Sequence, residues 1–313
     1  MSGPLYRDEL PHLDGDRLFI ADGGMETTLI FHRGIDLPCF ASFALLKDDV
    51  GREELRAYFE PYLALARERG VGLVLDTVTW RANPDWAAQL GYSLDELDEA
   101  HRQAVAFAEE LRAAAGDTPV VINGVVGPRG DGYVPGEQMT ADEAQRYHAR
   151  QVRTFADSAV DMVTALTMTY PDEALGVVRA ARDAGMPVAI SFTVETDGRL
   201  PNGERLKDAI AYVDAQTGGA AAYFMINCAH PTHFAGVLDG DGWLDRIGGL
   251  RVNASAKSHA ELDEAEELDE GDPVALGAEH AELRPRLRSV RLIGGCCGTD
   301  HRHVAEICAA WTG

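Results

Sequence analysis

Residues 120–126 read VVINGVV, a run in which Asn123 is the only polar side chain. Nearly continuous apolarity over so short a run favours a parallel strand buried on both faces, because a strand with one face in water would alternate. Seven further runs of this kind occur along the chain: Leu18–Ala21, Gly72–Thr77, Met162–Thr167, Val188–Thr193, Ala222–Cys228, Leu250–Ala254 and Val290–Gly294. The sequence therefore predicts eight buried parallel strands.

The segments between these runs have the spacing of amphipathic helices. Ser93 with Glu96, and Thr140 with Glu143, have the spacing of capping boxes that open helices. The predicted helices are Glu53–Arg69, Leu94–Ala115, Ala141 to about Ser158, Pro171–Ala184, Gly203–Gln216 and Asp300–Trp311.

Eight β–α units without a break in composition predict an α/β fold, a single (β/α)8 TIM barrel over residues 1–313, with residues 1–16 as an N-terminal extension. The alternative is a doubly wound open sheet. It is disfavoured because no G-x-G-x-x-G turn follows the first run.

The chain is strongly acidic, with 51 Asp and Glu against 28 Lys and Arg and a net charge of −23. Such a surface repels phosphate backbones and anionic lipid, so neither nucleic acid nor a membrane surface is an expected partner. No signal peptide and no apolar stretch long enough for a membrane helix are visible. The five cysteines are odd in number and two are adjacent, which is typical of a reducing compartment, so we expect a cytoplasmic protein. The oligomeric state stays open, and a homo-oligomer is compatible with the sequence.

One segment is biased: Glu261 to Asp272 reads ELDEAEELDEGD. We expect a solvated helix or loop after the seventh strand. The alternative is a charged lid over the barrel mouth.

The predicted strand ends carry the candidate chemistry, because barrels gather their active sites there. Cys228 ends the sixth strand, and Cys296 with Cys297 follows the eighth. These strands lie two places apart around a closed barrel, so their ends approach across the mouth. Three thiolates with one open position suit zinc, which lowers the pKa of a further thiol and makes it a nucleophile at neutral pH. Gly294 and Gly295 are expected to let the chain turn sharply, so that both following cysteines face one metal.

Other residues could compete for these roles. Cys39 and Cys308 are expected to be small packing residues, and His230 is a reserve metal ligand. A zinc hydrolase is disfavoured, because three thiolates make zinc a poor acid for water and no carboxylate adjoins the cysteines. A non-catalytic zinc- or thiol-binding protein remains an alternative.

Five stretches resemble the zinc-dependent homocysteine S-methyltransferase family: DGGMETTL at 22–29, GVVGPRGDGY at 124–133, SFTVETDGRLPNGERLKDA at 191–209, INCAHP at 226–231 and IGGCCGTD at 293–300. The resemblance covers about Leu18 to Trp311. It implies a TIM barrel, zinc held by Cys228, Cys296 and Cys297, and methyl transfer from a small sulfonium or quaternary ammonium donor to a thiol.

The resemblance also implies roles for single residues. Asp22 would help to hold the amino-acid part of homocysteine, and Gly23 and Gly24 would let the substrate approach the backbone. Thr77 would line the same pocket. Asn227 would orient the site from outside the metal's own ligands.

The chain departs from the family pattern at two strand ends. The fourth strand of the family commonly ends in E-T-x-P, with the glutamate binding the substrate ammonium, whereas Leu166 stands at that position here. The seventh commonly ends in P-N-x-G, and this chain keeps only Asn253, followed by Ala254, Ser255, Ala256 and Lys257. Two acceptors stay open: homocysteine, giving methionine, or another thiol or selenol. Phe40, Trp80 and Trp86 are candidates to face a cationic donor, with ordinary packing as the alternative. Lys257 and Glu195 are candidates to reach the mouth.

Overall fold

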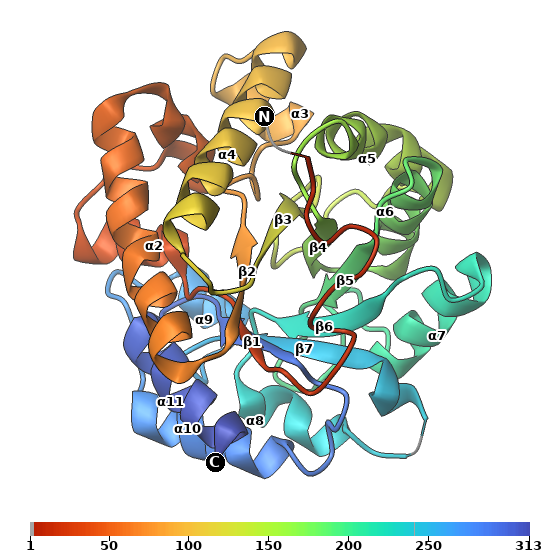
Figure 1. Cartoon of the computed structure of the whole chain (residues 1–313). Coiled ribbons are helices and arrows are strands. Elements are labelled where there is room, and N and C mark those ends of the chain that lie inside the picture. Colours follow the sequence, from red (N-terminus) through yellow and green to blue (C-terminus); the bar gives the residue numbers. More distant parts are fainter. Residues whose placement is uncertain (1–2, 241) are drawn as a thin grey trace.

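Eight parallel strands close into a barrel in the order β1 to β8 in the computed structural model, which describes residues 3–240 and 242–313 (Figure 1). β1 pairs with both β2 and β8, which closes the ring. The strands are β1 (Phe19–Ile20), β2 (Gly72–Asp76), β3 (Val120–Val126), β4 (Met162–Met168), β5 (Val188–Phe192), β6 (Tyr223–Asn227), β7 (Ile247–Val252) and β8 (Leu292–Gly295). The predicted (β/α)8 architecture is confirmed.

The described helices are α1 (Met25–Thr27), α2 (Asp49–Arg69), α3 (Pro84–Gln89), α4 (Leu94–Ala114), α5 (Ala141–Ala156), α6 (Pro171–Asp183), α7 (Leu206–Thr217), α8 (Pro231–Phe234), α9 (His259–Asp263), α10 (Pro273–Leu283) and α11 (His301–Thr312). Both predicted capping boxes are present. The predicted start of α7 at Gly203 is wrong, because residues 199 and 205 form a bridge that closes a turn before the helix. Helix α10 was not predicted, although Asp272 caps it just before Pro273.

β7 begins at Ile247, ahead of the predicted Leu250. Gly248 and Gly249 hid this start, because glycine has a low preference for strands. A Cβ atom at Gly249 would lie 3.0 Å from the Met225 side chain on β6, so close packing between the two strands favours glycine at this position.

The core has two layers. Most buried residues pack between the helices and the outside of the barrel. A smaller cluster fills the barrel interior, with Phe19, Val121, Met162 and Tyr223 among its members. This distribution explains why the strands are apolar on both faces.

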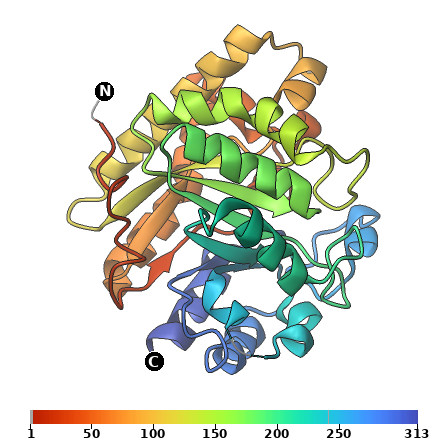
Figure 2. The same cartoon turned by 90° about the vertical axis from the view of Figure 1, so that its right-hand side faces the viewer.

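The predicted N-terminal extension closes the N-terminal end of the barrel, and its residues 1 and 2 lie outside the described residues (Figures 1 and 2). His12 is buried, and its ring lies 5.5 Å from that of Phe19 and 5.4 Å from that of Tyr223. The fully buried Asp161 accepts hydrogen bonds from the backbone N–H groups of Leu5 and Tyr6, at 2.7 and 2.8 Å. The segment is therefore part of the barrel's packing.

The acidic segment comprises the end of α9 and the loop that leads to α10. Most of its side chains face solvent, but Asp263 reaches the mouth of the barrel. Glu270 pairs with His32 at 2.8 Å and with Arg302 at 3.0 Å, which ties the loop to its surroundings. The segment therefore combines a solvated surface with one contact to the mouth. Within residues 3–240 and 242–313, no helix has the length and apolarity needed to span a membrane.

Candidate functional site

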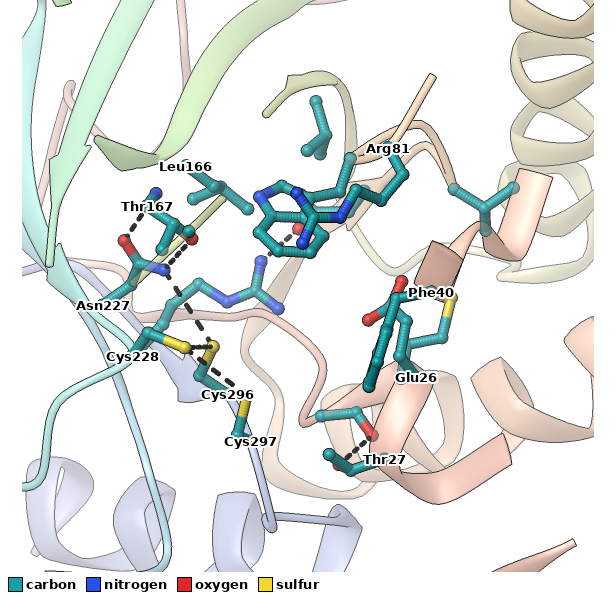
Figure 3. A pocket seen from close by; sticks show the side chains of 18 of the residues that line it. Glu26, Thr27, Phe40, Arg81, Leu166, Thr167, Asn227, Cys228, Cys296 and Cys297 are labelled. Atoms are coloured by element: carbon teal, nitrogen blue, oxygen red, sulfur yellow. Dashed lines mark hydrogen bonds and ion pairs between the residues drawn. The ribbon is translucent and has the colours of Figure 1, made fainter. Parts of the chain in front are cut away.

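A cavity of about 360 Å³ opens at the C-terminal ends of the strands (Figure 3). Apart from the reserve ligand His230, its lining includes every residue that was expected to hold the metal or the substrate: Asp22, Gly23, Gly24, Thr77, Asn227, Cys228, Cys296 and Cys297. The barrel thus brings together side chains that are more than 200 positions apart in the sequence.

The three cysteines form one cluster. The Cys228 sulfur lies 3.0 Å from that of Cys296 and 3.5 Å from that of Cys297. Hydrogen bonds from Cys228 and then Cys296 hold the pKa of Cys297 well below its usual value. Soft sulfur donors at this separation, facing a cavity, suit a metal ion such as zinc. All five cysteines of the chain are free.

Two residues at the cluster have a strained backbone conformation. Cys228 has φ of 55° and Thr167 has φ of 62°, a left-handed conformation that costs non-glycine residues on the order of 1–3 kcal/mol. Asn227 holds Thr167 in place: its Oδ1 accepts from the Thr167 N–H at 2.9 Å, and its Nδ2 donates to the Thr167 hydroxyl at 2.8 Å. Nδ2 also lies 4.0 Å from the Cys296 sulfur. Asn227 therefore links the end of β4 to the cysteine cluster, and its role in orienting the site stays a prediction.

The glycines around the cluster serve close packing. A Cβ atom at Gly24 would lie 2.6 Å from the Cys296 carbonyl oxygen, and one at Gly23 would lie 2.7 Å from that of Thr299. The sharp turn expected at Gly294 and Gly295 is misplaced, because Gly295 still belongs to β8 and the positive φ of 77° occurs at Gly298. The Gly23 and Gly24 distances show that the end of β1 packs against the loop after β8 too closely for a side chain at either glycine.

An arginine in β7 controls the floor of the cavity. Arg251 is buried and forms ion pairs with Asp22 and Asp76, and its Nε donates to the Gly295 carbonyl at 3.1 Å. Burial opposes its charge, yet the two carboxylates raise its pKa overall. Desolvation raises the pKa of Asp22 to about 6, an effect that Arg251 partly offsets. Asp22, expected to hold the substrate's amino-acid part, is thus already engaged by a cation.

Thr77 is likewise occupied. Its hydroxyl accepts from the Val125 N–H at 3.0 Å and lies 2.7 Å from the Thr79 hydroxyl. It lines the cavity as expected, while its hydrogen bonds hold β2 against β3.

Tyr133 covers the thiols from the loop between β3 and α5. Its hydroxyl lies 3.3 Å from the Cys297 sulfur and 3.7 Å from that of Cys228. Its ring stacks on His259 with centroids 4.2 Å apart, and His259 Nε2 lies 2.8 Å from the Cys228 carbonyl oxygen. A ligand for the open side of the cluster must share this space with the Tyr133 hydroxyl.

The aromatic side chains at the mouth divide into two groups. Trp80 and Trp86 sandwich the Arg81 guanidinium, which lies 4.2 and 4.1 Å from their ring centroids. Each therefore has a face already taken by a cation. Phe40 is exposed and lies beside Glu26 on the wall opposite Leu166, Thr167 and Asn227 (Figure 3).

Glu26 is the remaining acidic group deep in this wall. Its Oε1 accepts from the Ser42 hydroxyl at 2.9 Å. Desolvation raises its pKa to about 7. Leu166, on the other side, is buried and lines the cavity with an uncharged side chain.

The other candidates are placed as follows. Cys308 is buried in α11 as expected, whereas Cys39 is half-buried and lines the cavity. His230, the reserve ligand, caps α8 and lies 3.3 Å from Glu279. Lys257 pairs with Asp269 at 3.4 Å.

Glu195 lies 3.1 Å from His259, behind the stacked Tyr133 ring. The described lining of the cavity includes neither Glu195 nor Lys257.

Sequence reasoning gave no role to Arg251, Glu26 or Tyr133. The available signal for Arg251 was a charge inside an apolar run (GGLRVNA). Glu26 and Tyr133 lie within two of the family-like stretches, DGGMETTL and GVVGPRGDGY, but nothing in those stretches indicates a role for either residue. Their positions in the cavity depend on contacts with distant segments.

Comparisons with known proteins agree on one family. The family model described as homocysteine S-methyltransferase matches residues 19–311. The chain is 24% identical to homocysteine S-methyltransferase YbgG of Bacillus subtilis over 61% of each protein, so the alignment spans about three fifths of that relative. It is 23% identical to selenocysteine Se-methyltransferase of Brassica oleracea var. italica, over 70% of this chain and 67% of the relative. The metallated form of homocysteine methyltransferase MmuM from Escherichia coli has the same fold, with a TM-score of 0.71 and 21% identity over 95% of this chain and 97% of that one.

Proposed function

The chain belongs to the homocysteine S-methyltransferase family, and on that premise we propose that it is a zinc-dependent methyltransferase that methylates a thiol, with homocysteine giving methionine as the leading reaction. The observation that carries the proposal is the convergence of three cysteine sulfurs on one wall of a cavity. A small molecule fits in that cavity, and the described residues provide no other cluster of this kind.

Cys228, Cys296 and Cys297 would hold the zinc. When bound, zinc would lower the pKa of the acceptor thiol, so that the acceptor reacts as a thiolate near neutral pH. The protein's own part is positional: two hydrogen bonds with Asn227 hold Thr167 in its strained conformation, and Cys228 is buried at the end of β6. Thiols that must stay reduced to bind a metal support a cytoplasmic location as part of the proposal.

The donor is proposed to be a small onium compound, a sulfonium or a quaternary ammonium. The acceptor sulfur forms a bond to the methyl carbon, the carbon–onium bond breaks, and its electron pair leaves with a donor that is now neutral. The acceptor's thiol proton is released to solvent. The cavity favours such a donor, because its lining has five carboxylates against two guanidinium groups: Asp22, Glu26, Asp76, Asp131 and Asp263 against Arg81 and Arg251.

A second candidate keeps this chemistry and changes the acceptor to another thiol or a selenol. Leu166 favours it, because this side chain offers no charge to an amino acid on the β4 side of the cavity. The similarity to a selenocysteine Se-methyltransferase also supports it.

The test compares Cys296→Ala with Cys308→Ala, a matched change at a buried cysteine outside the cavity. We expect Cys296→Ala to lose stoichiometric zinc by elemental analysis and to lose methyl transfer, with an unchanged circular dichroism spectrum. Cys308→Ala should keep both zinc and turnover. Stoichiometric zinc in Cys296→Ala would refute the ligand set.

A panel of thiols and selenols, each offered with an onium donor, then identifies the acceptor. Saturable turnover of homocysteine would remove the second candidate. Zinc binding without turnover for any donor and acceptor pair would indicate a binding protein instead of an enzyme.

A further inference from the structure

Glu26 stands apart from the other acidic groups of the cavity. It lies at the centre of the short helix α1, on the wall opposite Leu166 (Figure 3). Its Oε1 accepts a hydrogen bond from the Ser42 hydroxyl at 2.9 Å, and among the described residues no lysine, arginine or histidine forms an ion pair with it. A carboxylate in such a place has capacity for a further donor.

Three of the other carboxylates that line the cavity already form ion pairs. Asp22 and Asp76 share the Arg251 guanidinium. Asp131 lies 3.5 Å from Arg81, which Trp80 and Trp86 hold in place. A cationic ligand would therefore gain more from Glu26 than from these paired acids.

The surroundings of Glu26 suit an organic cation. A half-buried carboxylate without an ion-pair partner is poorly solvated, which raises the pKa of Glu26 to about 7, and a bound positive group would restore the charged form. The exposed ring of Phe40 beside it adds an aromatic face to the same wall. Glu26 and the three cysteines line the same cavity of about 360 Å³, so a small molecule can reach both the thiol cluster and this carboxylate.

We propose that Glu26 receives the positively charged group of a bound substrate, either the ammonium of an amino-acid thiol or the onium centre of a methyl donor, as a specificity-determining residue of this chain. The inference rests on the proposed function for the identity of the ligands. The positive group would lie against Glu26 and Phe40 on the α1 side of the cavity, opposite the uncharged Leu166.

The experiment measures binding to the zinc-loaded protein by isothermal titration calorimetry. Three probes separate the sources of charge: homocysteine, 4-mercaptobutanoate (the same thiol without the amine) and trimethylsulfonium. Glu26→Gln removes the charge and retains the shape and the Ser42 contact. Glu279→Gln is the matched control, because Glu279 is also a partly buried glutamate of raised pKa but lies outside the cavity lining.

We expect Glu26→Gln to weaken one cationic probe by about ten- to a hundredfold, the range for a hydrogen bond to a charged group. Binding of 4-mercaptobutanoate should stay within about threefold, as should all probes with Glu279→Gln. A loss confined to homocysteine assigns the ammonium to Glu26, and a loss confined to trimethylsulfonium assigns the donor.

The proposal is overturned if Glu26→Gln leaves both cationic probes unchanged, or if it weakens 4-mercaptobutanoate equally. Because the readout is binding, a protein that shows no turnover still gives an answer. Failure of the proposed function would appear separately, as the absence of zinc and of methyl transfer.

Discussion

Arg251→Met is the most informative test of the cavity floor. Methionine keeps much of the side-chain length but removes the guanidinium that Asp22 and Asp76 share. All three side chains are at least nine-tenths buried, so solvent cannot replace the lost cation. The variant leaves two carboxylates close together without a partner.

The expected cost is about 3–5 kcal/mol of unfolding free energy at pH 7.5, the range for breaking a buried ion pair from one side. We place it at the upper end, because one guanidinium serves both carboxylates. For a chain of this length the urea midpoint should fall by roughly 1–2 M.

The loss should depend on pH. Burial already raises the pKa of Asp22 to about 6, and removing Arg251 takes away the effect that opposes this rise. A carboxyl whose folded pKa is raised favours folding most below its unfolded pKa, near 4, and loses that contribution as pH rises through the folded pKa. Lowering the pH from 7.5 to 5.5 should therefore restore stability to Arg251→Met more than to the unmodified protein.

Urea denaturation at both pH values measures this, with Arg102→Met as the control. Arg102 forms an exposed pair with Glu99, so its replacement should change the free energy by less than about 1 kcal/mol. The reasoning is refuted if Arg251→Met matches this control at pH 7.5. It is also refuted if the gap to the unmodified protein widens at pH 5.5.

Three further predictions concern the walls and the closed end of the barrel. Tyr133→Phe removes the hydroxyl over the Cys297 sulfur, so thiol ligands should bind about three- to tenfold tighter with unchanged zinc content, as titration calorimetry will show; weaker binding would contradict a covering role. Leu166→Glu adds a carboxylate to the opposite wall and should tighten homocysteine binding relative to its deaminated analogue, whereas no change in that ratio would mean that the amine does not reach this wall. Asp161→Asn weakens the buried contact with Arg112, so urea denaturation should show a loss of about 3 kcal/mol in unfolding free energy. Asp161 also binds the backbone of Leu5 and Tyr6, so a loss under 1 kcal/mol would show that the N-terminal segment packs without this carboxylate.

Several features could be predicted because their causes are local. Runs such as Val120–Val126 are apolar on both faces because each strand lies between the barrel interior and a layer of helices. The capping boxes at Ser93 and Thr140 involve residues three apart, so spacing alone identifies them. Where local signals are weak, as at Gly248 and Gly249 in β7, the predicted boundary was displaced.

The cysteine cluster was also within reach of the sequence, because strand order alone brings the ends of β6 and β8 to one mouth. The contacts that surround the cluster could not be predicted from the sequence. Asn227 contacts Thr167 across 60 positions of sequence, and the left-handed conformation of Cys228 follows no residue preference. The sharp turn was expected at Gly294 and Gly295, but both residues belong to β8, and the positive φ occurs at Gly298.

The sequence by itself determined the barrel and the cysteines that gather at its mouth. Only the tertiary structure decided which charges are free to act. Arg251 forms an ion pair with Asp22 from 229 positions away, while Glu26, four residues after Asp22, forms no ion pair with a cation among the described residues. The physical reason is that a buried charge takes its properties from neighbours in space, and closing the barrel selects those neighbours from distant strands.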